Sequence, residues 1–315
     1  MVEIIWFRAD LRLADQPALA AAAAAGPVLP VALASAGSAR APGGAARWWR
    51  ARSLAALDQA IRARGGPGLL MLETVADLAA LGRKLGARAI HAMPSDDPGW
   101  GADEARLGPL LKLHGTSTLL PLEPLRTRAG GRFRVFTPFA RAHESQGDPP
   151  PPAPAPARID WAPKPPGGAP LPRYAPRWAA GFADASWQPG EAGAAARLAE
   201  FVARVAAYGG RRDFPSEPAT SRLSPHLAFG EISPATVWHA VVAAAGAAAR
   251  PFTRQLIWRD FARELIGQFP DSATRAHRPA FEGMAWTDVE ASPGRKHPAR
   301  VAGFIEAVRR EEQEP

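Results

Sequence analysis

The chain of 315 residues contains no cysteine. Disulfide bonds, thiolate metal sites and cysteine nucleophiles are therefore excluded, and the composition suits a reducing compartment. No apolar run approaches the roughly 18 residues needed to span a bilayer. The first residues favour a β-strand over a basic signal peptide. We therefore expect a cytoplasmic protein with no membrane association.

Lysine is scarce, yet arginine brings the formal net charge to +8 and the pI to about 10.8. A basic surface attracts polyanions, and nucleic acid is the most common polyanionic partner. A GC-rich genome also enriches a protein in arginine and alanine, which would produce this charge without any function. The charge alone leaves both interpretations open.

Glycine-rich nucleotide loops are missing as well. The first expected strand–helix turn, Phe7 to Leu13, has no GxGxxG pattern, and the chain has no Walker A sequence. Both observations argue against a dinucleotide Rossmann site or a P-loop. A local pair between Arg8 and Asp10 would explain the charged turn without function. The sequence also shows no metal-ligand cluster and no obvious hydrolytic triad, so we expect no metal.

Strand and helix patterns alternate over the first 120 residues. The expected strands are Glu3–Arg8, Val28–Leu33, Leu69–Leu72, Ala89–Ala92 and Ser117–Leu120. The expected helices are one from an Asp15 cap to Ala25, Arg47–Arg64, one that begins at a Thr74–Asp77 capping box, and Ala102–Leu113. This alternation predicts that residues 1–130 form an α/β domain, with a parallel five-stranded Rossmann-like sheet covered on both faces.

The composition changes between Gln146 and Pro176, where proline is abundant. Proline removes backbone donors and fixes φ, so this stretch cannot be a regular helix or a central strand. We assign residues 131–190 to an interdomain linker. Residues 191–315 show helical periodicity and no strand pattern, which predicts an all-α domain. Its helices are expected at Glu191–Tyr208, from a Ser233 cap to about Ala249, and at Phe252–Phe269.

A loop rich in hydroxyl groups follows the first of these helices. It contains Thr220, Ser221, Arg222 and Ser224, directly before Pro225. Hydroxyls, backbone N–H groups and an arginine can converge on a bound diphosphate. Such loops are also common as ordinary caps and turns. Composition leaves the two interpretations open.

The last expected helix carries a polar and aromatic cluster. Gln255, Trp258 and Arg259 fall within an arc of about 100° on a helix. Trp258 could stack on a nucleic-acid base, and Gln255 could hydrogen-bond to its edge. The alternative is a core tryptophan beside a structural ion pair.

Taken together, four stretches resemble the DNA photolyase and cryptochrome family in its class I-like form. The opening IIWFRADLRLADQPAL is similar to the family's WFRRDLRLxDNxAL, and FRVFTPF at 133–139 is similar to YKVFTPF. RDFP at 212–215 with TSRLSPHLAFGEISP at 220–234 is close to the flavin-binding signature. QLIWRDF at 255–261 resembles ELIWREFY. The matches keep the family's order and cover about residues 1–286.

This resemblance implies light-driven, FAD-dependent repair of cyclobutane pyrimidine dimers in DNA, the reaction of a deoxyribodipyrimidine photo-lyase, a carbon–carbon lyase. Excited reduced flavin gives an electron to a dimer flipped out of the duplex, the ring splits and the electron returns. By the same resemblance the flavin contacts would be Tyr208, Thr220, Ser221, Arg222, Leu223, Ser224, Phe252 and Arg259.

The resemblance also implies DNA contacts. Arg212 would bind a phosphate, Arg259 would lie at the DNA site, and Gln255 and Trp258 would touch the dimer as catalytic residues. Gln255 stands where photolyases for cyclobutane dimers usually have glutamate, which favours a cryptochrome-like blue-light photoreceptor as the alternative. Trp286 would belong to the tryptophan chain that photoreduces the flavin. Many members carry a folate or deazaflavin antenna, but residues 94–105 do not identify one.

The resemblance ends after Trp286. The family continues with a segment like WQxGxTGxPxVDAxMRxLxxTGWxHNRxRM, which supplies further flavin and DNA contacts and is not found here. We therefore expect an incomplete FAD-binding domain, through a frameshift or early stop near residues 292–296 or through natural shortening. A monomer is expected, and a non-catalytic fragment is a third interpretation. Helical spacing of Val301, Phe304, Ile305 and Val308 favours one terminal amphipathic helix.

Overall fold

A computed structural model gives the fold of the chain. It describes residues 1–34, 42–95, 99–182, 187–273 and 275, and after them only 290–292, 295–296, 299, 302–303 and 306. Residues 1–268 form one compact unit and residues 269–315 a second. Trp286 and the expected terminal-helix positions Val301, Phe304, Ile305 and Val308 lie outside the described residues.

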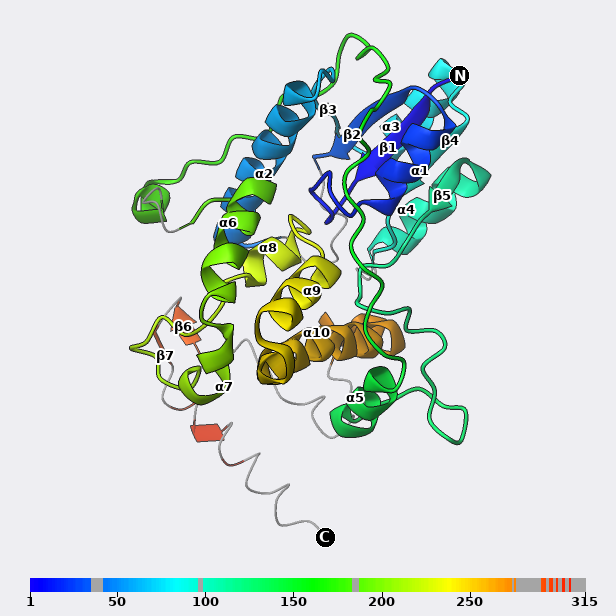
Figure 1. The fold of residues 1–315 in the computed structure, drawn as a ribbon. Coiled ribbons are helices and arrows are strands. Elements are labelled where there is room, and N and C mark those ends of the chain that lie inside the picture. The colour runs from blue at the N-terminus through cyan, green and yellow to red at the C-terminus, as the bar shows by residue number, and fades with distance from the viewer. Residues whose placement is uncertain are drawn as a thin grey trace. The chain divides into compact units, whose positions relative to one another are not determined.

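A five-stranded parallel sheet lies at the centre of the first unit (Figure 1). The strand order is β3-β2-β1-β4-β5. All five residues of β1 are buried, as a parallel sheet covered on both faces requires. The predicted α/β fold with five parallel strands is confirmed. The strands are β1 (Glu3–Phe7), β2 (Val28–Leu33), β3 (Leu70–Leu72), β4 (Ala89–Ala92) and β5 (Leu111–Leu113).

Helices cover both faces of this sheet. They are α1 (Pro17–Ala25), α2 (Gly44–Ala63), α3 (Val75–Leu85) and α4 (Trp100–Leu107). Successive side chains of a strand point to opposite faces. Accordingly, Ile5 and Phe7 share a core with α1 and α2, whereas Ile4 and Trp6 share one with α3 and α4.

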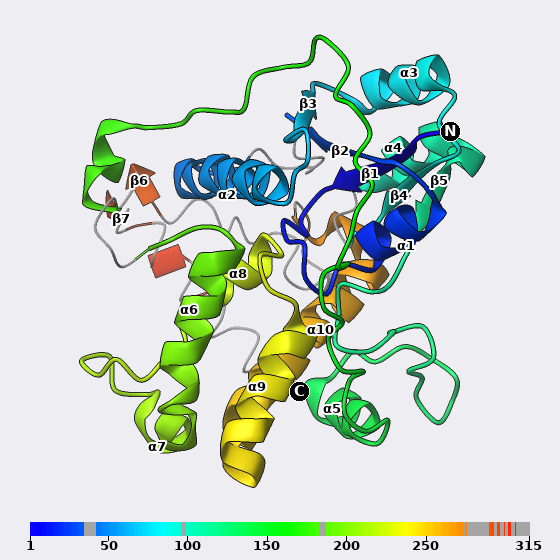
Figure 2. The same ribbon diagram turned by 45° about the horizontal axis from the view of Figure 1, so that its top comes forward.

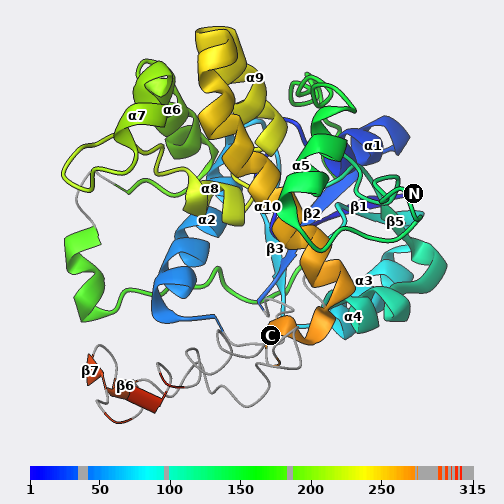
Figure 3. The same ribbon diagram turned by 90° about the horizontal axis from the view of Figure 1, so that it is seen from below.

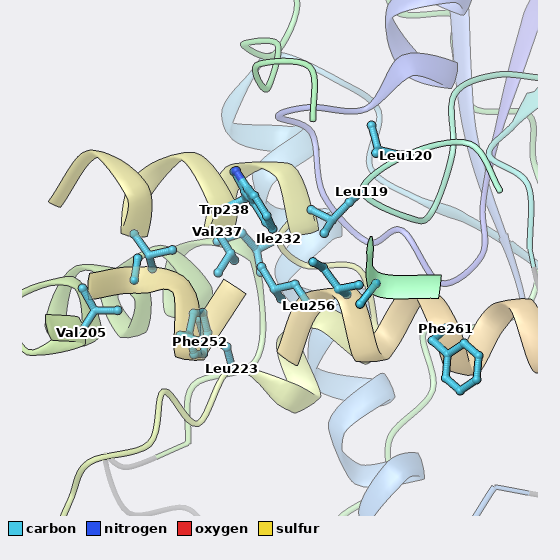
Figure 4. Packing of buried hydrophobic residues seen from close by; sticks show 14 of the residues in the cluster. Leu119, Leu120, Val205, Leu223, Ile232, Val237, Trp238, Phe252, Leu256 and Phe261 are labelled. Carbon is cyan, nitrogen blue, oxygen red and sulfur yellow. The ribbon is translucent and has the colours of Figure 1, made fainter. Parts of the chain in front are cut away.

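The prediction of the fifth strand at Ser117–Leu120 is wrong, as is the extension of the preceding helix to Leu113. Helix α4 ends at Leu107 because Gly108 adopts a positive φ of 53° and Pro109 follows it. The strand β5 therefore begins six residues earlier than predicted. Leu119 and Leu120 instead pack into the core beside α10 (Figure 4).

The predicted Asp15 cap of α1 is wrong, whereas the predicted capping box of α3 is confirmed. The side chain of Gln16, and not that of Asp15, caps α1 by accepting from the N–H of Ala18. Asp15 adopts a φ of 48°, and its carboxylate accepts from the N–H of Ala153 at 3.0 Å. The Thr74–Asp77 capping box of α3 is confirmed.

The turn after β1 pairs Arg8 with Asp10 only through the backbone. The N–H of Arg8 donates to Asp10 Oδ1 at 2.6 Å. The Arg8 guanidinium instead pairs with Glu104, and it donates to the carbonyl of Met93. The charged turn is therefore a structural contact between the ends of β1 and β4.

The remaining helices of the first unit are α5 (Phe136–Glu144), α6 (Glu191–Val202), α7 (Tyr208–Arg211), α8 (Ser224–Ala228), α9 (Pro234–Ala245) and α10 (Arg250–Gln268). The predicted helix from Glu191 to Tyr208 is broken after Val202 by a 3₁₀ turn before α7. The predicted Ser233 cap is confirmed, since its hydroxyl accepts from the N–H of Thr236. Helix α9 lies beside α10 (Figure 2), and α5 packs against α10 (Figure 3).

The second unit contains two short strands that the sequence pattern did not predict. Strand β6 (Glu290–Ser292) pairs antiparallel with β7 (Arg295–Lys296). The domain boundaries at residues 130 and 190 stay a prediction.

A buried carboxylate joins α2, which covers the sheet, to the helices α6 and α8 of the first unit. Glu231 is 0% exposed. It accepts from Trp49 Nε1 at 3.0 Å and from the Ser53 hydroxyl, both on α2. It also accepts from the N–H of Gly190 at 2.7 Å, and His226 Nδ1 of α8 lies 2.5 Å away. One side chain therefore links α2, α8 and the start of α6.

A second junction lies at the carboxyl end of β1. The strand order places the topological switch point here, where α/β sheets commonly bind ligands. The chain itself contacts this end: Arg12 donates to the carbonyl of Gly230 at 3.0 Å, and Phe229 accepts from the N–H of Leu11 at 3.1 Å. Gly230 has a φ of 65°, and a Cβ there would lie 2.1 Å from the Ala9 carbonyl oxygen. Only glycine fits this position.

We expect Glu231→Gln to lower the free energy of unfolding by about 2 to 4 kcal/mol, because an amide NH₂ would face donors in a buried site. Urea denaturation at neutral pH measures this change. Glu73→Gln, at an exposed position before α3, is the control and should stay within about 0.5 kcal/mol of wild type. Equal stability of the two variants would contradict the role of Glu231 as the junction.

Candidate functional site

The hydroxyl-rich loop leads from α7 to α8. Thr220 and Ser224 are exposed, whereas Ser221 is half-buried. The hydroxyl of Ser221 accepts from the N–H of Leu223 at 3.3 Å, and the Leu223 side chain is fully buried. Leu223 therefore anchors the loop, while two hydroxyl groups face outward.

Arg222 has an unusual backbone conformation within this loop. Its φ of 54° lies in the left-handed region, which costs a non-glycine residue energy. Its guanidinium carbon lies 4.3 Å from the centre of the Trp187 ring. This cation–π contact fixes the direction of the exposed arginine side chain.

Tyr208 and Phe252 come together in the core behind the loop. Their rings meet edge to face at 5.2 Å, and both contact Phe201, at 5.9 and 4.5 Å. Leu223 belongs to the same buried cluster, and Figure 4 shows it next to Phe252. The structure therefore brings together three of the predicted flavin contacts, from α7, the loop and α10.

A small cavity of about 120 Å³ adjoins Tyr208. Arg204 Nε is buried there without a hydrogen-bond partner, so the cavity contains an unused cationic donor. Arg211 and Glu217, also at the cavity, pair with each other at 2.5 Å. The lining consists of Arg204, Ala207, Tyr208, Arg211, Glu217, Pro218 and Ala219.

Trp258 lies on the outer face of α10 and is 44% exposed. Its ring stacks on Phe136 of α5, with centroids 3.5 Å apart and planes 7° from parallel. The Arg254 guanidinium lies 5.0 Å from the Phe136 ring centre. Gln255, on the same helix, is half-buried. The interpretation of Trp258 as a core residue is wrong, and its exposure leaves ring surface for a ligand.

Arg259 contacts the α/β part of the unit. Its Nη1 donates to the carbonyl of Ser117 at 2.7 Å, and burial lowers its pKa. Arg263 donates to the Ser117 hydroxyl at 2.6 Å, and burial lowers its pKa to about 10. Both arginines thus hold the segment after β5 against α10. Flavin and DNA contacts of Arg259 stay predictions.

A buried acid–histidine pair lies on the same helix and was not predicted from the sequence. Asp260 Oδ2 accepts from the N–H of Leu119 at 2.9 Å and lies 3.2 Å from His143 Nε2 of α5. Asp260 Oδ1 and His143 Nδ1 are buried without hydrogen-bond partners. Burial raises the pKa of Asp260. More than 100 residues separate the two partners, so no local pattern could have found the pair.

Arg212 is accessible beside the aromatic core. Its guanidinium carbon lies 5.7 Å from the Tyr208 ring centre, and its Nε is 3.6 Å from the exposed carboxylate of Asp213. This weak surface pair leaves the charge of Arg212 available to a polyanion.

Comparison with known proteins identifies the family. The family model of DNA photolyase matches residues 3–157. The deoxyribodipyrimidine photo-lyase of Agrobacterium fabrum is 39% identical over 310 residues, which cover 92% of this chain and 64% of that protein. The chain belongs to the DNA photolyase and cryptochrome family. It spans about two thirds, 64%, of the length of this curated relative.

Solved photolyases share the fold of the chain. A bacterial class III photolyase from Agrobacterium tumefaciens superposes with a TM-score of 0.82 at 36% identity, covering 90% of this chain and 63% of that structure. An archaeal photolyase from Sulfolobus tokodaii, solved with two FAD molecules, has a TM-score of 0.70 at 21% identity. The match covers 91% of this chain and 64% of that one. At 21% identity, the likeness to the archaeal structure shows a shared fold alone.

Two kinds of feature are absent from the described residues. No helix there is long and apolar enough to cross a membrane. Within the same residues, no group of three or more histidine, aspartate or glutamate side chains could hold a metal ion.

The raised pKa of Asp260 predicts a pH-dependent effect of Asp260→Asn. A carboxyl group whose pKa is raised on folding stabilises the fold fully at pH values below its unfolded pKa, and this contribution is lost as the pH rises through the folded pKa. Asparagine has no such loss. We therefore expect the stability of Asp260→Asn relative to wild type to improve between pH 4 and pH 8, as measured by urea unfolding. A difference that stays constant or moves the other way would contradict the buried carboxyl.

Proposed function

We propose that this chain binds FAD and DNA as part of a light-driven lyase that splits cyclobutane pyrimidine dimers. One observation carries the proposal: an exposed tryptophan, Trp258, lies on the helix whose first turns pack behind a loop of outward hydroxyl groups. The helix α10 therefore connects a surface for a base with a surface for a phosphorylated cofactor. Membership of the photolyase family is the reason for proposing FAD and dimer-containing DNA as the ligands of these two surfaces.

The described residues fit the diphosphate part of FAD. Thr220, Ser224 and Arg222 are exposed on one loop, and Arg204 Nε is an unused buried donor in the adjoining cavity. Hydroxyl and guanidinium donors are the groups that bind phosphate oxygens. The cavity of about 120 Å³ has room for a small anionic group, but it is smaller than the 300 to 1,000 Å³ of typical cofactor pockets. The loop and the cavity therefore match the diphosphate of FAD, and not the whole cofactor.

Bound flavin would supply the light-absorbing electron donor. The chain's own part is to bind and orient. Tyr208 and Phe252 form a rigid aromatic wall behind the loop, and Leu223 fixes the loop to that wall. No group needs to transfer a proton, which agrees with a surface built from hydroxyls, arginines and rings.

The substrate side consists of Trp258 and Arg212. The flat Trp258 ring, held by Phe136, can stack on a base that has left the duplex. A dimer leaves the stack more easily than normal bases, because its stacking is already weakened. Arg212 would hold a phosphate of the same strand. We also propose that the chain acts as a monomer in the cytoplasm.

Gln255 supports a second candidate function. It stands next to Trp258 on α10 and is half-buried. An amide stabilises added negative charge less than a protonated carboxyl group can, so repair would be less efficient. A blue-light photoreceptor of the cryptochrome type needs no such stabilisation, and its output would be binding of a partner.

The proposal is tested in two steps on the purified chain. We expect flavin absorption bands, and light-dependent restoration of a dimer-containing oligonucleotide when the flavin is reduced. A colourless protein that cannot be loaded with FAD would exclude both candidate functions. Flavin binding without repair would exclude the lyase and favour the photoreceptor.

Replacing Trp258 tests the substrate side. We expect Trp258→Leu to lower the preference for dimer-containing over undamaged DNA by at least about fivefold, because one base stack is worth roughly 1 to 3 kcal/mol. Trp178→Leu is the matched control, since Trp178 is also exposed, at 49%, but lies elsewhere. Fluorescence anisotropy at fixed salt measures both affinities. An unchanged preference in Trp258→Leu would contradict the assignment.

A further inference from the structure

We propose that a cavity at the end of α2 is a binding site for a nucleoside monophosphate. The cavity, called the α2-end cavity below, has a volume of about 420 Å³, within the range of about 300 to 1,000 Å³ that small-molecule sites have. None of its lining residues belongs to the proposed flavin or DNA surfaces, so the inference goes beyond the proposed function. The described residues that line it are Arg64, Ala157, Arg158, Ile159 and Trp161.

The linker forms one wall of the cavity and is held there by backbone hydrogen bonds. Val28 donates its N–H to the carbonyl of Asp160 at 2.7 Å, and its own carbonyl accepts from the N–H of Ala162 at 2.9 Å. These bonds attach the linker beside the first residue of β2. Arg64 Nη1 donates to the carbonyl of Pro156 at 2.9 Å, where the linker passes the end of α2 (Figure 1). The lining stretch is therefore fixed at both of its ends.

Trp161 brings a positioned aromatic ring to the cavity. Its Nε1 donates to the carbonyl of Arg64 at 3.1 Å. The ring lies close to Gly66, where a Cβ would be 3.0 Å from Trp161 Cε2 and 2.6 Å from Ile61 Cγ2, so glycine permits this approach. Trp161 is half-buried, which leaves part of the ring accessible. A fixed indole with accessible surface suits a planar ligand ring such as a nucleobase.

Two arginines give the cavity its charge. Arg64 and Arg158 are both exposed, and neither forms an ion pair with another residue in the described part of the chain. The bond of Arg64 to the Pro156 carbonyl orients its guanidinium without neutralising it. The described lining contains no carboxylate. Guanidinium groups bind phosphate oxygens in a bidentate manner, so this pair favours a phosphate monoester as the anionic group.

The ring and the arginines together favour a nucleoside monophosphate over simpler ligands. Inorganic phosphate would use the arginines but would leave Trp161 and Ile159 without a partner. A neutral aromatic molecule would use the ring and leave two charges unused. A nucleoside monophosphate has a base for the ring and a dianionic phosphate for the guanidinium groups, so it uses both parts of the lining.

Titration of the purified full chain with AMP tests the site, with inorganic phosphate and adenosine as partial ligands. We expect saturable binding of AMP in isothermal titration calorimetry, at least about fivefold tighter than that of either partial ligand. Absence of saturable AMP binding up to about 1 mM overturns the proposal. Equal affinities for AMP and inorganic phosphate overturn it as well, because the base would then contribute nothing.

A charge reversal at Arg158 locates the site. We expect Arg158→Glu to weaken AMP binding at least about fivefold, because a repulsive charge replaces an attractive one. Arg173→Glu is the matched control, since it makes the same change of net charge at another exposed position of the linker. This control should keep the wild-type affinity. Equal losses in the two variants would show a general effect of net charge and overturn the α2-end cavity.

Trp161→Leu tests the ring separately from the charges. We expect this variant to lose affinity for AMP at least about fivefold and to keep the wild-type affinity for inorganic phosphate, because only the base uses the ring. A variant that merely unfolds the linker would lose both. Unchanged AMP affinity in Trp161→Leu overturns the proposal.

AMP is also a part of FAD, so one further variant separates this cavity from the proposed flavin loop. Arg222→Ala changes that loop and should leave the AMP affinity near wild type. AMP binding that is lost in Arg222→Ala and kept in Arg158→Glu would assign AMP to the flavin loop and overturn the cavity. If the chain binds no FAD but AMP binding depends on Arg158, the cavity stands and the proposed function is wrong.

Discussion

The carboxylate of Glu231 is buried between α2 and α8, and the placing of the candidate site depends on it. A buried carboxylate is costly unless its oxygens are fully hydrogen-bonded, and here donors from three segments of the chain supply those bonds. Because Glu231 follows the hydroxyl-rich loop and α8, these bonds also set where that loop lies relative to the sheet. The contact of Gly230 with Ala9 allows no side chain and fixes the same turn from its other side.

Helix α10 serves the fold on one side and presents its candidate ligand surface on another. Its buried side carries Asp260, with Arg259 beside it, and these polar groups hold residues 117–119 instead of packing as an apolar stripe would. Its outer side carries Arg254 and Trp258, which contact Phe136 and solvent. The inner side thus combines apolar core residues at helical spacing with polar anchors, and the outer side stays exposed at Trp258.

Local patterns were enough to predict much of the fold. The alternating strand and helix patterns predicted the parallel sheet, and the Thr74 and Ser233 caps depend on residues within three positions of each other. The fifth strand was misplaced because the end of α4 depends on the backbone of Gly108. At the site, the hydroxyl loop and Trp258 could be found from motifs. The Asp260–His143 pair and the Glu231 contacts could not, because their partners are distant in the sequence and are polar residues without a repeating pattern.

We expect the sheet and the helices that carry the candidate site to unfold as one cooperative unit, because Glu231 and Arg12 join them. Native-state hydrogen exchange measures this most directly, because it gives an opening free energy for each amide. The slowest amides of β1 and those of α9 and α10 should then exchange with the same free energy, that of global unfolding. Amides of α9 and α10 that exchange through a separate opening, several kcal/mol below that of β1, would contradict it.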